Sequence, residues 1–128
     1  MSSPPAPGTD PTAGRPETLS MQGPTSFRCH VSRERDTASV RPVGELDLAT
    51  VPLLSAPVAE LREAGWRHLI VDLSELTFID STGLRFLLEC YAESRHDGFT
   101  LALRPGPPAV QQVFEITDTT NHLPFIEP

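Results

Sequence analysis

The sequence contains no lysine, and all ten of its basic residues are arginines. P-loop nucleotide-binding proteins need a lysine on the phosphates, and Schiff-base enzymes need a lysine amine, so both classes are excluded. A receiver domain with an aspartyl phosphate is disfavoured for a related reason. Asp72 and Asp80 resemble its acidic pocket, but the lysine that would pair with the phosphoryl group is missing.

Cysteine is also scarce. Cys29 and Cys90 stand 61 residues apart without a Cys-x-x-Cys motif or a histidine-rich neighbour, so neither a disulfide framework nor a zinc site is predicted. We expect two free thiols that are buried as small apolar groups. The four histidines form no metal-binding or catalytic pair, and we predict no cofactor and no enzymatic activity.

Long apolar runs are absent as well. No stretch of 18 apolar residues is available to cross a bilayer, and the first residues lack the basic and apolar regions of a secretory signal. The net charge of −7 repels nucleic-acid phosphates and anionic lipid. We therefore expect a cytoplasmic protein that binds neither nucleic acid nor membrane directly.

The chain divides into a tail and one domain. Residues 1–26 contain 17 Pro, Gly, Ser and Thr residues, a composition that buries too little apolar surface to offset its ordering entropy. We predict a disordered tail over 1–26 and one folded domain over 27–128. The chain printed here stops at Pro128.

The folded part alternates predicted strands and helices, which indicates an α/β domain with a small mixed β-sheet backed by about three to four helices. We expect two antiparallel edge strands, a helix capped by Thr50 that Pro57 kinks or splits, and a strand covered by helices on both faces. A second helix, a half-buried strand, a third helix and a short final strand follow. Their predicted ranges, in order, are 27–32, 38–43, 50–65, 68–73, 81–97, 99–104, 108–117 and 123–126.

The most informative segment is Asp80-Ser81-Thr82-Gly83, where an apolar run ends and a helix begins. The following residues Leu84, Leu87, Leu88 and Tyr91 recur with helical spacing. Ser81 therefore lies at a helix N-terminus, where free N–H groups and the helix dipole favour an oxygen ligand or a negative charge. Two interpretations are open: Asp80 or Ser81 simply caps the helix, or Ser81 receives a phosphoryl group.

Four segments in order resemble the STAS family, and in particular the bacterial anti-sigma factor antagonists. Residues 78–84 (FIDSTGL) are similar to the phosphoacceptor turn of that family, and residues 43–47 (VGELD) with Thr50 are similar to the turn before its first helix. Residues 68–73 resemble the buried strand, and residues 108–116 resemble a later helix. The resemblance implies a single STAS domain; antagonists of this kind usually continue into a further helix beyond the last predicted strand.

The resemblance also implies the functional residues. Ser81 would be the phosphorylated residue. The partner-binding surface would comprise Glu45, Asp47, Asp80, Ser81, Thr82, Gly83 and Phe86. From the residues alone, Glu45 and Asp47 are equally well explained as turn-forming and capping residues, and Phe86 as part of the core. Gly83 is expected to allow close backbone approach of the partner.

The implied function is partner switching. The unmodified protein would bind an anti-sigma factor that is also its serine kinase, and would thereby free the sigma factor. Phosphorylation of Ser81 would release it, and a separate phosphatase would restore the hydroxyl. ATP and Mg²⁺ would belong to the kinase. STAS domains also occur where no serine is modified, so the alternative is an interaction module of a larger assembly, such as a lipid-transport complex, in which Ser81 is only an N-cap.

Overall fold

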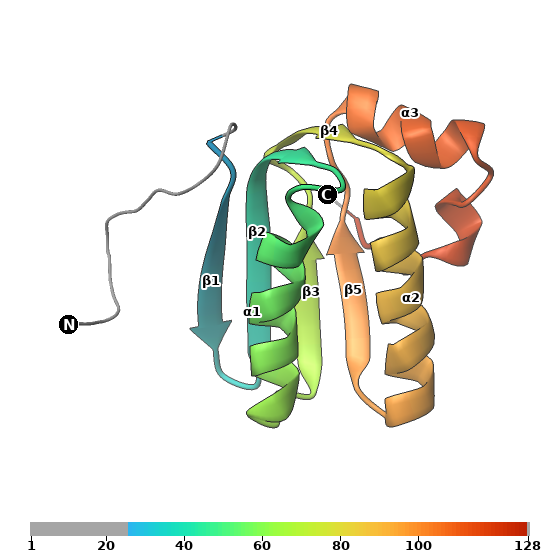
Figure 1. Cartoon of the computed structure of the whole chain (residues 1–128). Helices are drawn as coiled ribbons and strands as arrows, with labels where there is room; N and C mark the ends of the chain where they lie inside the picture. The colour runs from blue at the N-terminus through green and yellow to red at the C-terminus, as the bar shows by residue number, and fades with distance from the viewer. Residues whose placement is uncertain (1–25, 128) are drawn as a thin grey trace.

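The computed structural model describes residues 26–127, which form a mixed five-stranded sheet with three α-helices and a short 3-10 helix (Figure 1). The predicted tail lies almost entirely outside the described residues. The strands are β1 (Arg28–Glu34), β2 (Thr37–Leu46), β3 (His68–Asp72), β4 (Leu76–Ile79) and β5 (Thr100–Arg104). The helices are α1 (Val51–Glu63), α2 (Ser81–Asp97), α3 (Pro108–Ile116) and η2 (Thr120–His122). The predicted α/β class is confirmed, although β4 and η2 were not predicted.

The sheet has the order β1-β2-β3-β5, and β4 pairs with the last residues of β2. The hairpin of β1 and β2 is antiparallel as expected, whereas β2 runs parallel to β3 and to β4. The prediction that both hairpin strands lie at an edge is therefore wrong for β2. This ten-residue strand is interior, because its first part is paired on both sides and its second part continues along β4.

Helices α1 and α2 cover the same face of the sheet (Figure 1). The crossovers β2–α1–β3 and β4–α2–β5 both run across the sheet in the direction away from β1, so their shared right-handedness places both helices on one side. The prediction that β3 is covered by helices on both faces is consequently wrong. Leu69 and Val71 are buried, while His68 on the other face is exposed.

Pro57 neither ends nor divides α1, which is one helix from Val51 to Glu63. A proline lacks the N–H that would bond to the carbonyl four residues earlier, which here is the carbonyl of Leu53. The Cys29 thiol donates to that carbonyl oxygen across a Sγ–O distance of 3.4 Å. The thiol of β1 thus partly satisfies the carbonyl that Pro57 leaves free.

The end of the chain differs from the predicted last strand. Residues 123–126 make a single parallel bridge, Leu103 with Phe125, supported by the N–H of Ile126 donating to the Leu103 carbonyl. Pro124 has no N–H to donate, so a regular ladder does not extend along this segment. Phe125 packs edge-to-face on Phe114, with 5.1 Å between the ring centroids, in the core beneath α3.

Candidate functional site

Asp80 caps α2. Its backbone is extended, and its Oδ1 accepts hydrogen bonds from the N–H groups of Thr82 and Gly83 over 2.9 and 3.0 Å. The Leu84 N–H then donates to the Asp80 carbonyl, which starts the regular helical pattern. Of the two residues considered as caps, Asp80 therefore takes the role through its side chain.

Ser81 is the first residue of α2 and is exposed. Within residues 26–127 its hydroxyl makes no hydrogen bond, and the neighbouring N–H groups of Thr82 and Gly83 donate to Asp80 instead. The fold does not require this hydroxyl for capping. It stands at the positive end of a 17-residue helix.

The turn between β2 and α1 lies beside Ser81. The Asp80 N–H donates to the Leu46 carbonyl over 3.2 Å, which joins the start of α2 to the end of β2. Figure 1 shows both connections at the same end of the molecule. The structure thus brings together two segments that are far apart in the sequence, as the resemblance implied.

The Thr50 side chain fixes the backbone of this turn by hydrogen bonds. It is 3% exposed, and its hydroxyl donates to the Glu45 carbonyl over 2.6 Å and accepts from the Asp47 N–H over 2.9 Å. Thr50 therefore precedes α1 as predicted, but its side chain does not cap that helix. Instead, Asp47 Oδ1 accepts from the N–H groups of Ala49 and Thr50.

Asp47 and Glu45, the two acidic residues of this turn, differ in their roles. Asp47 is half-buried and engaged in the turn, which agrees with a structural role. Glu45 is exposed and pairs in register with Phe78 of β4. Its carboxylate is available to a partner.

Gly83 does not lie on the surface. It is buried, and a Cβ at this position would come within 2.9 Å of Ile79 Cγ1 and of Leu46 Cγ. The expectation that its missing side chain admits a partner needs correction, because that space faces the core. Thr82 is half-buried beside it, with its N–H held by Asp80.

Phe86 is half-buried and stands apart from the Ser81 turn. It lines a groove of about 220 Å³ between α1 and α2, together with Val58 and Cys90. Its ring is accessible but lies more than one helical turn below Ser81.

Sequence reasoning missed two exposed apolar residues near the site. The side chain of Leu48, in the turn before α1, is 74% exposed, and Phe78 of β4 is 47% exposed. Phe78 begins the FIDSTGL segment, and Leu48 follows Asp47 directly. An apolar residue in or beside a polar turn is the sequence feature that could have indicated the exposure of Leu48 and Phe78.

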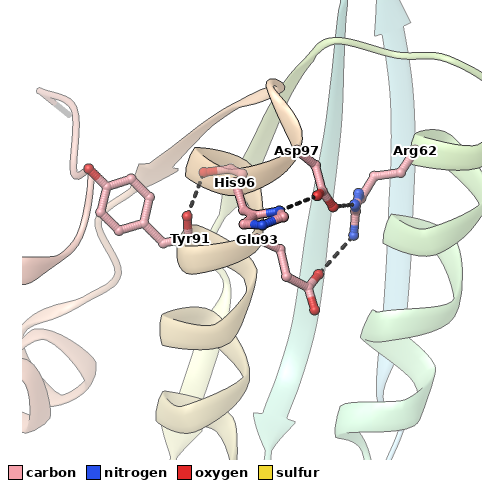
Figure 2. A network of polar contacts seen from close by, with 6 residues as sticks. Arg62, Tyr91, Glu93, His96 and Asp97 are labelled. Carbon is pink, nitrogen blue, oxygen red and sulfur yellow. Dashed lines mark hydrogen bonds and ion pairs between the residues drawn. The ribbon is translucent and has the colours of Figure 1, made fainter.

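The opposite end of the helix pair is the main competing site. A hollow of about 370 Å³ there is lined by Trp66, Arg67 and Phe99, among others. Arg62 of α1 bonds to Glu93 and Asp97 of α2 over 2.8 and 2.6 Å, as Figure 2 shows, and its guanidinium lies 4.3 Å from the Phe99 ring centroid.

The charged side chains of this network pair with one another. His96 lies in hydrogen-bond contact with Asp97, and this contact, together with Arg62, lowers the pKa of the Asp97 carboxyl. The Arg62 guanidinium is already paired with two carboxylates, and Arg67 donates to the Gly98 carbonyl. We therefore interpret this end as a clamp between α1 and α2 rather than as a ligand site.

The two cysteines are free thiols, as predicted. Burial raises the pKa of each thiol to about 12, so neither is a nucleophile at neutral pH. Cys90 is buried, and Cys29 is half-buried beneath α1. Among the helices of residues 26–127, none combines the length and the apolar character needed to cross a membrane.

Comparisons with known proteins agree with this geometry. Residues 29–126 match the protein family described as "Mlab, STAS domain". The anti-sigma-B factor antagonist of Staphylococcus aureus strain NCTC 8325 is 31% identical over 74 residues, which cover 58% of this chain and 68% of that protein.

Solved structures share the fold. An anti-sigma factor antagonist from Mycobacterium paratuberculosis superposes with a TM-score of 0.71 at 23% identity, covering 82% of this chain and 89% of that chain. The Bacillus cell fate determinant SpoIIAA in its phosphorylated form superposes with a TM-score of 0.60 at 22% identity, covering 80% and 91%. With the ordered motifs, the sheet topology and the family match in agreement, this chain belongs to the STAS domain family.

Proposed function

We propose that this protein is an anti-sigma factor antagonist that switches partners through phosphorylation of Ser81. The observation that carries the proposal is the division of roles at the start of α2: Asp80 caps the helix, and Ser81 is exposed and takes no part in the cap. Related and structurally similar proteins are anti-sigma factor antagonists, and one of them has been solved in a phosphorylated form.

The charge of a phosphoryl group explains the switch. Phosphoserine adds about −1.5 to −2 charges. Because the Asp80 carboxylate already accepts from the Thr82 and Gly83 N–H groups, the new charge gains little neutralisation from them. It adds instead to the exposed acidic surface that includes Glu45. Desolvating this charge in an interface costs several kcal/mol, enough for a roughly 100-fold loss of affinity.

The partners follow from the same chemistry. The unphosphorylated form binds an anti-sigma factor that is also a serine kinase, which supplies ATP and Mg²⁺, and the sigma factor is freed. A phosphatase returns the hydroxyl. The protein itself acts in the cytoplasm as a binding protein and not as an enzyme. Glu45, Asp80, Ser81 and Thr82 lie at the contact, with Asp47 holding the turn.

The test uses the purified serine-kinase anti-sigma factors of the source organism, each incubated with radiolabelled ATP, Mg²⁺ and the full-length chain. One of them should label the wild type and fail to label Ser81→Ala, which should stay bound. Ser81→Asp should fold normally and bind weakly. Ser74→Ala is the matched control, because Ser74 is also exposed in a turn but lies outside α2.

Labelling that persists in Ser81→Ala, with the phosphate mapped to Thr82 or Ser74, would contradict the proposal. Intact mass of the protein purified from its host provides an independent measurement. A cycling antagonist shows a fraction heavier by one phosphoryl group, whereas a STAS interaction module without a phosphoryl cycle shows a single mass.

A further inference from the structure

The Leu48 side chain combines high exposure with a rigid backbone. It is 74% exposed, although the turn that carries it is closed by hydrogen bonds among the backbone, Asp47 and Thr50. An exposed leucine on a flexible loop would be unremarkable, since isolated apolar side chains on a surface are common. A leucine held out by a fixed turn is different, because little conformational freedom remains to be lost when a partner covers it.

Leu48 also stands beside the serine. The Leu46 carbonyl accepts the Asp80 N–H, so Leu48 is two residues from one end of that hydrogen bond and Ser81 is one residue from the other. On the neighbouring strand, Phe78 pairs in register with Glu45 and adds a second exposed apolar group. Each of the two segments joined by this hydrogen bond thus carries an exposed apolar residue, and the β2 segment also carries the exposed Glu45.

We propose that Leu48 is the apolar anchor by which the kinase partner recognises the Ser81 end. This inference rests on the proposed function and adds to it the chemistry of the partner. The partner's surface should contain an apolar pocket that takes the Leu48 side chain, rimmed by arginine or lysine side chains that meet Glu45 and Asp80. Charge complementarity favours this partner over a second copy, because two copies would bring these acidic groups together.

The anchor and the phosphoryl group act against each other. Leu48 gains affinity only when water leaves the contact, whereas a phosphoryl group on Ser81 holds water in the same contact. Placing the two side by side makes the apolar contribution conditional on the unmodified serine.

The experiment measures the dissociation constant of the full chain for the kinase that labels the wild type, together with labelling of Ser81. Leu48→Ala should weaken binding by about 10-fold or more, the size expected from one leucine side chain leaving water. Leu48→Asp should weaken it further, and Leu48→Met should restore most of the affinity. Thermal unfolding should stay close to wild type for all three variants, because the side chain is exposed.

Ile116→Ala is the matched control. Ile116 is 75% exposed, close to the value for Leu48, but lies at the end of α3, outside both turns of the site. Its replacement should leave the dissociation constant within about twofold of wild type.

The outcomes separate the two proposals. If the kinase binds and labels the wild type and Leu48→Ala equally, the proposed function stands and the anchor is refuted. Equal losses in Ile116→Ala and Leu48→Ala would also refute it, since the effect would not be local to the turn. If no kinase labels the wild-type chain, the proposed function fails, and the anchor fails with it.

Discussion

The two ends of the α1–α2 pair differ in what their polar side chains bind. At the lower end in Figure 1, Arg62 joins the helices by ion pairs to Glu93 and Asp97, so side chains of the two helices bind one another. At the Ser81 end, the side chains of Asp80 and Thr50 bind backbone groups of their own turns, and Leu48 and Ser81 are left exposed.

The difference shows where a binding surface can exist. The Ser81 end lies at the carboxyl ends of the parallel strands, where α/β proteins commonly place their sites. Its polar side chains fix the backbone instead of pairing across the helices. Side chains that are not used internally are then available to a partner, whereas Arg62 at the clamp end is paired with two carboxylates of α2.

The largest expected effect on stability comes from Gly83 at the start of α2, and Gly98 just after the end of that helix is its comparison. Gly83→Val should lower the free energy of unfolding by about 3 kcal/mol, because the new side chain overpacks against Ile79 and Leu46. Gly98→Ala should cost only about 1 kcal/mol, from its φ of 80°, since the space around it is open. Urea unfolding of the two variants measures both values. Equal losses would mean that the core beneath Ser81 is loosely packed.

A smaller effect is expected from Thr50→Val, which keeps the shape of the side chain and removes its hydroxyl. The Glu45 carbonyl and the Asp47 N–H lose their partner, at a cost of about 1–2 kcal/mol in unfolding free energy. Kinase affinity should also fall, because the turn no longer fixes Leu48. Thr50→Ser should restore both quantities. Loss of stability with unchanged affinity would mean that the Thr50 hydrogen bonds stabilise the fold but do not position Leu48 for the partner.

The smallest effect should come from Arg62→Leu at the clamp end, and it should depend on pH. The pKa of Asp97 is lowered in the folded protein, so its ionised form stabilises the fold above the ordinary carboxyl value of 3.8, and that contribution disappears as the pH falls through the lowered pKa. The difference in melting temperature between wild type and Arg62→Leu should therefore shrink as the pH drops below 3.8.

Arg62→Leu should affect stability but not partner binding. Kinase affinity should change by less than about twofold in Arg62→Leu, because the clamp lies at the far end of the helices. A larger change would show that the partner reaches along the groove past Phe86.

The periodic segments of the fold were predictable from the sequence. The apolar stripe after Ser81 and the left-handed Gly98 gave α2 its correct extent, residues 81–97. β4 was missed because its four residues, with exposed Thr77 and Phe78, lack strict alternation. The interior position of β2 depends on partners more than twenty residues away, which local patterns do not encode.

The roles of individual residues at the proposed site were harder to predict than its segments. The resemblance implied one surface for Glu45, Asp80 and Ser81, and the structure joins their segments through the hydrogen bond from the Asp80 N–H to the Leu46 carbonyl. Whether Asp80 or Ser81 caps α2 depends on the direction of one carboxylate, and both residues are good caps by type. Gly83 was assigned to the surface because the sequence does not show which way its absent side chain would point. Leu48 was missed because exposure follows from the turn geometry.

The length of β2 has a consequence for how the domain opens. One strand is shared between the β1–β3 half of the sheet and the β4 connection that leads to Ser81. Detaching it would break both halves at once, so the two halves form a single cooperative unit. The turn before α1 and the turn before α2 both belong to that unit and are not independent loops. Their mutual arrangement should therefore persist for as long as the native state does, and a partner would meet a surface that is already assembled.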